Sequence, residues 1–212
     1  QLDNDAIVFG AEEYLREALA PYAAEPPLLL AIISSCAAGL IGDDIEAIAR
    51  GAGLSCPIAV LDSSGLSGSF ADGWDKAACA VLSAFLPEQR AGQANAVNLI
   101  GVTSAYYNGE NDAHELMRLL ALAGYHVNVA LGCDMSAADL SGLTQAALNI
   151  VVHDELGGGA ARLLAETCGM PCIAPLPPYG RAGTRKWLVE IGRALPAPRA
   201  DAAEEEITRV TR

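Results

Sequence analysis

Aromatic and basic residues are both scarce in this chain of 212 residues. Phe, Trp and Tyr together make up 5% of it, and 13 Lys and Arg stand against 26 Asp and Glu, a formal net charge of −13. A protein face that binds nucleic acid or an anionic membrane surface needs an excess of positive charge. The composition therefore argues against nucleic acid and against membranes as partners.

Long apolar runs and targeting signals are also missing. The sequence has no run of 18 apolar residues of the kind that spans a bilayer. The first residues, Gln1 to Asp5, lack the basic region of a signal peptide. The chain begins without Met and close to a predicted strand, which we interpret as the start of an excised segment. We expect the cytoplasm as its compartment.

A cysteine-pair motif and a nucleotide-binding motif are absent as well. The six cysteines, at 36, 56, 79, 133, 168 and 172, contain no C-x-x-C pair, and an Ala-rich chain of this length without a signal peptide is not expected to be a disulfide framework. Five of the six are expected to be buried small hydrophobic residues, Cys36 being the exception. The sequence lacks G-x-x-x-x-G-K-[ST], so it is not expected to hydrolyse ATP itself.

What the sequence does have is a repeated pattern, in which a short apolar β-branched run is followed by a Gly or Asp turn and then by a helical stretch. Apolar residues make up 52% of the chain, enough for a substantial core. Alternating strands and helices at this spacing predict the α/β class, with two Rossmann-like units, parallel sheets and helices on both faces. The expected strands are 6–10, 28–34, 57–61, 96–102, 126–131, 148–153 and 171–174.

The expected domain boundaries follow changes in composition. A polar segment without periodicity, 87–94, separates a first unit over residues 1–90 from a second unit over 95–195. Residues 196–212 are Pro/Ala-rich and then acidic, and we expect them to lead to a third domain that the chain does not contain. A helix over 204–212 would then lack its packing partner.

Ligand sites in open α/β sheets lie beyond the carboxyl ends of the strands. Cys36 occupies such a place, because it follows the strand at 28–34 and precedes the helix that Asp43 and Asp44 begin. A helix N-terminus lowers the pKa of a nearby thiol, and the thiolate is the form that binds metal. One cysteine cannot hold an iron–sulfur cluster, which usually needs about four thiolates. From the residues alone, Cys36 is either a metal ligand or a buried cysteine.

Other strand ends carry weaker signals. Gly157 to Gly159 precede a predicted helix and either expose backbone N–H groups to an anion or form a flexible turn. Gly132, Cys133 and Asp134 form either a ligand-binding turn or a simple helix entry. His114 and His126 are expected at the surface.

Five motifs occur in a characteristic order. The first is Cys36-x4-Ile-Gly-Asp-Asp-Ile-Glu, the second is the Gly/Ser loop from Ser64 to Asp75, and the third is Val97-Asn-Leu-Ile-Gly. Ala147-Leu-Asn-Ile-Val with Gly169-Met-Pro, and the loop from Pro178 to Thr184, complete the series. Over residues 7–195 this ordered set resembles the nitrogenase component 1-type oxidoreductase family.

The resemblance implies roles for four residues. Cys36 falls on a cysteine that ligates an iron–sulfur cluster at the subunit interface, and Ser67 and Ser69 fall near that cluster. His153 falls where catalytic nitrogenase subunits carry the cysteine that anchors the iron–molybdenum cofactor. Imidazole can ligate metals, but a loop histidine satisfied by hydrogen bonds is the other interpretation. Because His153 is not Cys, we do not expect a dinitrogen-reducing subunit.

The resemblance also implies partners and a cofactor. The intact protein would carry an iron–sulfur cluster, pair with a homologous component 1-type subunit and accept electrons from an ATP-dependent iron–sulfur reductase. Its substrate would be dinitrogen, a tetrapyrrole ring or another molecule. The family's other cluster cysteines and its third domain lie outside this chain, so the chain alone is expected to hold no cluster and to be inactive. The alternatives are a metallocluster assembly scaffold or carrier, and a cluster-free two-lobed ligand-binding module.

Overall fold

The computed structural model describes residues 10, 12–34, 36, 42, 44–62, 68–85 and 92–209. The chain divides into two compact units, residues 1–86 and 87–212, and each is described by itself. The strand predicted at 6–10 lies, apart from Gly10, outside the described residues. No helix in the described ranges is long and apolar enough to cross a membrane.

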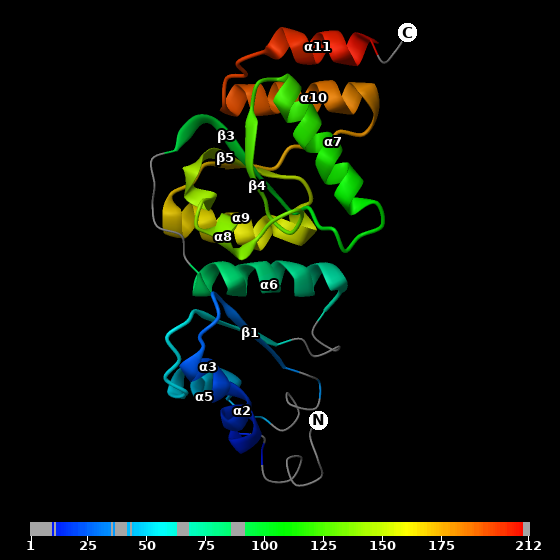
Figure 1. Cartoon of the computed structure of the whole chain (residues 1–212). Helices are drawn as coiled ribbons and strands as arrows, with labels where there is room; N and C mark the ends of the chain where they lie inside the picture. Colours follow the sequence, from blue (N-terminus) through cyan, green and yellow to red (C-terminus); the bar gives the residue numbers. More distant parts are fainter. Residues whose placement is uncertain are drawn as a thin grey trace. The chain divides into compact units, whose positions relative to one another are not determined.

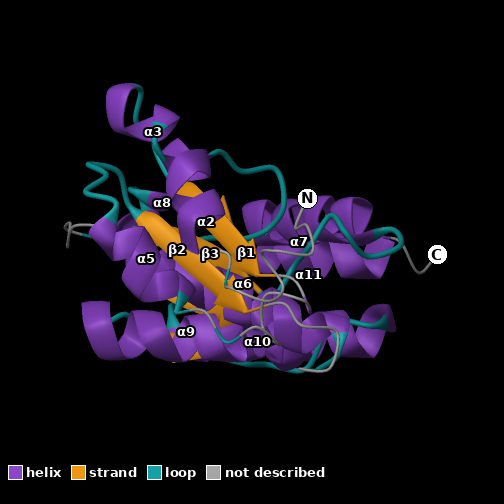
Figure 2. Ribbon diagram, turned by 90° about the horizontal axis from the view of Figure 1, so that it is seen from below, coloured by secondary structure: helices purple, strands orange, loops and turns teal. Residues whose placement is uncertain are grey.

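The first unit contains a parallel pair of strands, β1 (Leu30–Ser34) and β2 (Ile58–Asp62), which run side by side in Figure 2. Their register places Leu30 opposite Ile58 and Ser34 opposite Asp62. Figure 1 shows helix α6 (Phe70–Ala84) on one face of this pair and α5 (Ile45–Gly51) on the other. The remaining helices are α2 (Glu12–Leu19), which packs on α5, and the short α3 (Pro21–Ala24).

The second unit is built on a parallel sheet with the strand order β4-β3-β5-β6. These strands are β3 (Gln93–Ile100), β4 (His126–Ala130), β5 (Ala146–Val151) and β6 (Cys172–Ile173). The helices are α7 (Gly109–Leu122), α8 (Ala137–Leu140), α9 (Asp154–Cys168), α10 (Gly180–Ala194) and α11 (Ala200–Arg209), with a 3-10 turn at Leu143–Gln145. The described strands of both units are parallel, which confirms the predicted class.

Alternation along the strands of the second unit separates its two helical layers. Val97 and Leu99 face a buried cluster that includes Leu120 of α7 and Trp187 of α10. The neighbouring residue Ile100 points the opposite way, toward α9. Figure 1 shows α7 and α10 on one side of the sheet and α9 on the other. Both faces are therefore covered, as the nearly continuous apolar character of these strands predicts.

The C-terminal helix α11 differs from the expectation of a helix without a packing partner. Its residues Ala203 and Ile207 are buried against the second unit. Glu204 forms an ion pair with Arg185 of α10, and Glu206 lies 3.2 Å from Arg118 of α7. The prediction was wrong because α11 has an apolar stripe that α7 and α10 cover.

Candidate functional site

Cys36 lies just beyond the carboxyl end of β1, as predicted, and it is exposed. The interpretation of Cys36 as a buried cysteine is therefore wrong. Downstream, Asp44 caps α5 by accepting a hydrogen bond of 2.9 Å from the Ala47 backbone N–H. Of the loop between them, only Gly42 is among the described residues.

Ser69 lies beyond β2, and Ser67 lies outside the described residues. Ser69 is the N-cap of α6 and forms a reciprocal capping box with Asp72. The Ser69 backbone N–H and its hydroxyl each donate to the Asp72 carboxylate at 2.7 Å. These two bonds, the backbone one first, hold the pKa of Asp72 below its usual value. The capping box also explains why α6 begins at Phe70.

Cys36 and the helix cap Ser69 both follow strands of the same parallel pair in the first unit. Because β1 and β2 are parallel neighbours with Ser34 opposite Asp62, the segments that follow them leave the sheet at the same end. Cys36 and Ser69 belong to those segments. Both residues therefore follow the carboxyl ends of their strands, which is where ligand sites of open α/β sheets lie.

An iron–sulfur cluster needs more ligands than this edge offers. A group of at least three His, Cys, Asp or Glu side chains with converging ligand atoms occurs once in the described ranges, and it does not include Cys36. Cys36 can therefore supply one thiolate of the roughly four that a cluster usually takes. The described part of the chain does not fit a cluster by itself, and any cluster on Cys36 requires ligands from elsewhere.

His153 lies at the carboxyl end of β5 in the second unit and immediately precedes α9. Its side chain is 32% exposed, and its Nδ1 atom lies 3.8 Å from an Oε1 atom of Glu155. It borders a hollow of about 280 Å³ at the carboxyl ends of β3 and β5, here called the carboxyl-edge hollow. The hollow is lined by Val102, Thr103, Tyr106, Tyr107, Gly109, Asp112, Ala113, Leu116, Val152, His153, Glu155, Leu156 and Tyr179.

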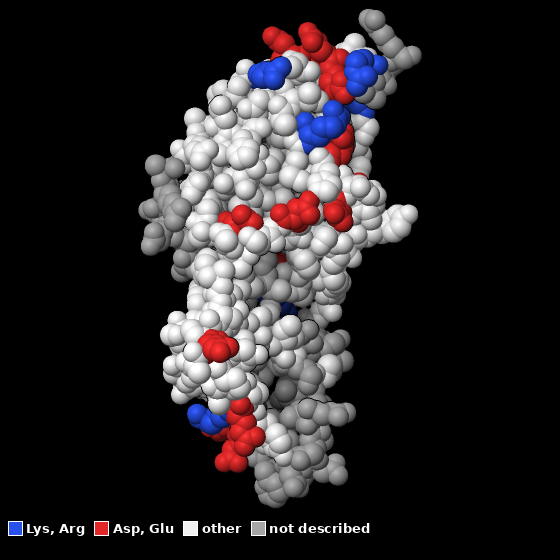
Figure 3. Space-filling model, in the orientation of Figure 1, with Lys and Arg blue, Asp and Glu red and all other residues white. Residues whose placement is uncertain are grey.

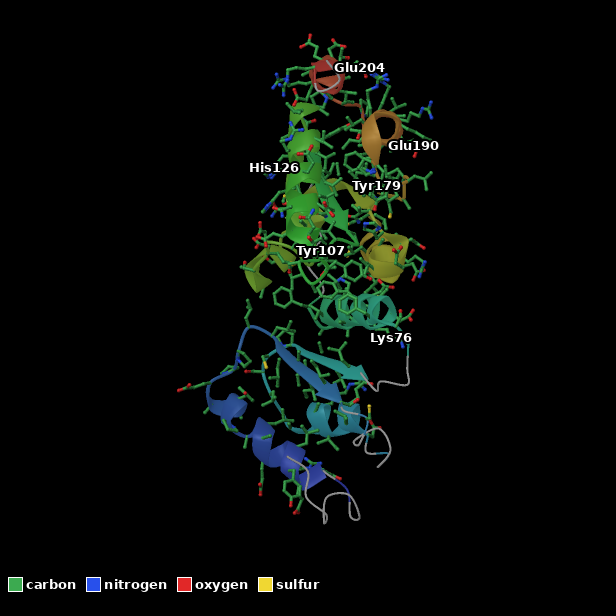
Figure 4. The ribbon with its side chains drawn as sticks, turned by 90° about the vertical axis from the view of Figure 1, so that its right-hand side faces the viewer. Lys76, Tyr107, His126, Tyr179, Glu190 and Glu204 are labelled. Carbon is green, nitrogen blue, oxygen red and sulfur yellow. The ribbon has the colours of Figure 1, made fainter. Side chains whose placement is uncertain are left out.

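The lining of the carboxyl-edge hollow suits an organic molecule. Three tyrosines border it, and two of them are strongly exposed, Tyr107 at 100% and Tyr179 at 77% (Figure 4). Phenol, imidazole and carboxylate groups offer hydrogen bonds, and exposed rings offer faces for stacking. The lining residues include no cysteine. A soft metal cofactor that needs a thiolate therefore has no such ligand in this hollow.

The glycine run Gly157–Gly159 proves to be part of a helix. α9 begins at Asp154, ahead of the glycine run that was expected to precede it, and Gly157 and Gly158 are buried. A Cβ atom on Gly157 would lie 2.5 Å from the backbone nitrogen of Gly101, so the absent side chain lets α9 approach β3 closely. Neither a flexible turn nor an anion-binding loop describes this segment, and both interpretations were wrong.

The remaining cysteines differ in exposure. Cys56 and Cys133 are buried, as predicted, and Cys79 and Cys168 are partly buried, whereas Cys172 is exposed. The prediction of burial was wrong for Cys172, which lies in the short strand β6 at the edge of the sheet. Burial, followed by the charges of Asp134 and Glu110, raises the pKa of the Cys133 thiol.

Sequence reasoning missed one group of side chains altogether. Glu110, His114 and Asp134 each place a ligand atom within 4.8 Å of the other two. His114 is exposed, as expected, but it also contacts the Asp134 carboxylate through Nε2. The available signal was the spacing of four between Glu110 and His114 on one predicted helix, with an aspartate just beyond the adjacent strand.

The fold defines a Rossmann-like α/β chain, with an exposed thiol and a histidine beyond the carboxyl ends of parallel strands. The sequence pattern of the family described as "Nitrogenase component 1 type Oxidoreductase" matches residues 1–212. The chain belongs to that family, which confirms the resemblance seen in the motifs.

Curated relatives and solved structures agree with this assignment. The chain is 29% identical over 174 residues to the B polypeptide of light-independent protochlorophyllide reductase from Prosthecochloris aestuarii, covering 78% of this chain and 31% of that protein. It is 29% identical over 203 residues to the polypeptide of the same name from Methylobacterium sp., covering 94% and 40%. A structure titled "Nitrogenase Cp1 at pH 5" superposes with a TM-score of 0.78 at 26% identity, covering 98% of this chain and 42% of that chain. The chain thus spans roughly a third of the length of such relatives.

Proposed function

We propose that this chain forms part of a subunit of a nitrogenase-like reductase that acts on an organic, ring-containing substrate. In the intact protein, electrons would come from an ATP-driven iron–sulfur reductase and pass through an iron–sulfur cluster to which Cys36 contributes one thiolate. Family membership supports the reductase class. The light-independent protochlorophyllide reductase relatives support a tetrapyrrole ring as the substrate class.

The observation that carries the substrate class is the lining of the carboxyl-edge hollow. By the family resemblance, His153 would stand where a thiolate anchors a metal cofactor. Tyr106, Tyr107 and Tyr179 line the same hollow as His153. These side chains can stack on a conjugated ring and donate to its carboxylate or carbonyl groups. None of the residues that line the hollow is a cysteine, so none can provide a thiolate ligand there.

The size of the hollow limits what this chain does alone. Its volume of about 280 Å³ lies just below the roughly 300–1,000 Å³ of typical small-molecule pockets. It would therefore receive one edge of a tetrapyrrole, and the rest of the protein or a second subunit would cover the remainder. A homologous component 1-type subunit, or the parts of the complete protein outside this chain, would be the source.

The test uses the complete protein that contains this chain, purified anaerobically with its partner subunit, an ATP-driven iron–sulfur reductase and MgATP. Protochlorophyllide and dinitrogen are offered separately, and product formation is followed by absorbance and by ammonia assay. ATP-dependent reduction of the ring without ammonia formation is expected. Ammonia formation, or transfer of the cluster to an acceptor protein without reduction of either substrate, would overturn the proposal, and the second outcome would identify an assembly carrier.

A further inference from the structure

Three potential metal ligands meet at the carboxyl end of β4 in the second unit, and none of them lines the carboxyl-edge hollow. Glu110 and His114 belong to α7, and Asp134 follows β4. One ligand atom of each lies within 4.8 Å of the others. We propose that these side chains bind a divalent first-row transition-metal ion of the Zn²⁺ class.

The local structure explains why the three groups converge. Residues four apart on a helix lie on the same face, so Glu110 and His114 project together from the first turns of α7. The loop after β4 is held beside the loop after β3 by a hydrogen bond from the Ser104 N–H to the Gly132 carbonyl oxygen, 3.2 Å long. This places Asp134 against His114, whose Nε2 contacts the carboxylate. Two chain segments thus contribute to one ligand set.

The donor types select the class of ion. Zn²⁺ accepts imidazole nitrogen together with carboxylate oxygen, and three protein ligands leave one position for water or another ligand. Ca²⁺ and Mg²⁺ prefer ligand sets made of oxygen alone, and Cu(I) and iron–sulfur clusters prefer sulfur. The neighbouring Cys133 is buried and does not belong to the converging group, so the ligand set contains no sulfur.

The charges around the group favour a cation. Within residues 92–209, neither Glu110 nor Asp134 forms an ion pair with a lysine or arginine. The nearby Arg118 is occupied by Glu115 and Glu206. Figure 3 shows a row of acidic side chains across the lower part of the second unit, while the basic atoms of that face gather near its upper end. A mobile cation is therefore attracted to carboxylates that no fixed positive side chain neutralises.

A plain ion pair between His114 and Asp134 explains less of the arrangement. Both side chains are about half exposed, 47% and 54%, and an exposed pair of this kind contributes little to stability. An ion pair also gives no role to Glu110, which brings a second carboxylate to the same point. Binding of a metal ion uses all three groups.

The test measures binding of Zn²⁺ and Co²⁺ to the full 212-residue chain. Calorimetry gives the dissociation constant of Zn²⁺, and the absorption spectrum of the Co²⁺ form reports whether thiolates are ligands. The variants are His114→Gln and Asp134→Asn, both of nearly unchanged shape. The control is His126→Gln, which alters an exposed histidine at the start of β4. Circular dichroism confirms that each variant is folded.

One Zn²⁺ per chain is expected to bind, and His114→Gln and Asp134→Asn should each weaken it at least about tenfold, the lower end of what loss of even an outer-shell partner costs. His126→Gln should leave the affinity unchanged, and the Co²⁺ spectrum should lack a thiolate charge-transfer band. Zn²⁺ should also raise the melting temperature of the parent and the control more than that of the two variants. Equal affinity in all four proteins, a thiolate band, or no stoichiometric binding would overturn the site.

Discussion

The side-chain amide of Asn98 on β3 donates to the side-chain carbonyl oxygen of Asn149 on β5 at 2.9 Å, and both residues are fully buried. The same Asn98 amide donates to the Leu143 carbonyl oxygen at 2.9 Å. The side-chain oxygen of Asn98 accepts a hydrogen bond from the side-chain amide of Asn128 on β4, also at 2.9 Å. Three adjacent parallel strands are thereby joined by side chains as well as by backbone.

Replacing Asn98 by Leu should destabilise the second unit strongly. The substitution keeps the branched shape of the side chain, with methyl groups in place of the amide oxygen and nitrogen. It leaves the Leu143 carbonyl, the Asn149 side-chain oxygen and one Asn128 donor without their Asn98 partner. Because each buried polar group left unsatisfied costs about 1–3 kcal/mol, we expect a loss of about 3 kcal/mol in the free energy of unfolding. Urea denaturation of the parent and the variant measures it.

The control for Asn98 is Asn111→Ala on the exposed face of α7, where the side chain bonds only to Asn108 among the described contacts. Its effect should stay within about 0.5 kcal/mol, as for ordinary surface changes. If both variants lost the same free energy of unfolding, the hydrogen bonds of Asn98 to its neighbours would not contribute specially to stability.

Replacing Gly157 by Ala should destabilise the protein although the residue lies within a helix. The new Cβ would lie 2.5 Å from the Gly101 nitrogen and 2.7 Å from Cγ2 of Ile100. Overpacking of this kind costs about 1–3 kcal/mol and outweighs the gain of about 1 kcal/mol in helix propensity. The melting temperature should therefore fall.

The matched control is Gly192→Ala in α10, where nothing lies within 4 Å of the new Cβ. There the helix propensity acts alone and should stabilise the protein by about 0.5–1 kcal/mol. Gly157→Ala should therefore lower the free energy of unfolding and Gly192→Ala should raise it. A stabilising Gly157→Ala would contradict the close approach of α9 to β3.

Replacing Ser69 by Ala should remove the N-cap of α6 without changing the iron content of the complete protein. The hydroxyl of Ser69 is engaged with Asp72, so its structural role accounts for its position. Loss of such a cap typically costs about 1 kcal/mol. Ser69→Asn, which retains a capping oxygen, should restore most of the stability, whereas iron lost in Ser69→Ala and not recovered in Ser69→Asn would indicate contact with a cluster.

The same capping box should respond to acid through Asp72. Its pKa is lowered by the Ser69 backbone hydrogen bond and then by the Ser69 hydroxyl. A lowered folded-state pKa means that the stabilisation is present above the unfolded value, about 4, and is lost as the pH falls through the folded value. The stability difference between the parent and Asp72→Asn should shrink steadily below pH ~4, measured by thermal unfolding. A difference independent of pH would contradict the ionised carboxylate.

Replacing Cys36 by Ala in the complete protein, with its partner subunit present, should lower the iron content while leaving the melting temperature of the apoprotein nearly unchanged. The side chain is exposed, so its removal creates no core cavity. Iron per chain and the visible charge-transfer absorption should fall together. Cys172→Ala, an exposed cysteine of the second unit, is the control and should retain its iron. Unchanged iron content in Cys36→Ala would favour the alternative of a ligand-binding module without a cluster.

The sequence by itself determined the class of fold and the family. Continuous apolar runs such as Val97–Ile100 are typical of strands buried on both faces, and their alternation with helical segments admits few arrangements. The place of Cys36 at the end of a strand also followed from the sequence, because chain order alone puts a residue after a parallel strand at the carboxyl edge of the sheet.

Only the tertiary structure decided which residues meet across the chain. The glycine run at 157–159 has the composition of a loop, yet the approach of α9 to Gly101 makes small residues necessary inside a helix. Glu110, His114 and Asp134 converge because two loops are bonded together. Asn98 and Asn149 meet because they are paired on β3 and β5, and Asn128 reaches Asn98 where the register between β3 and β4 shifts. Local propensity reports on neighbours a few residues apart, whereas these contacts join segments that only the packed sheet brings together.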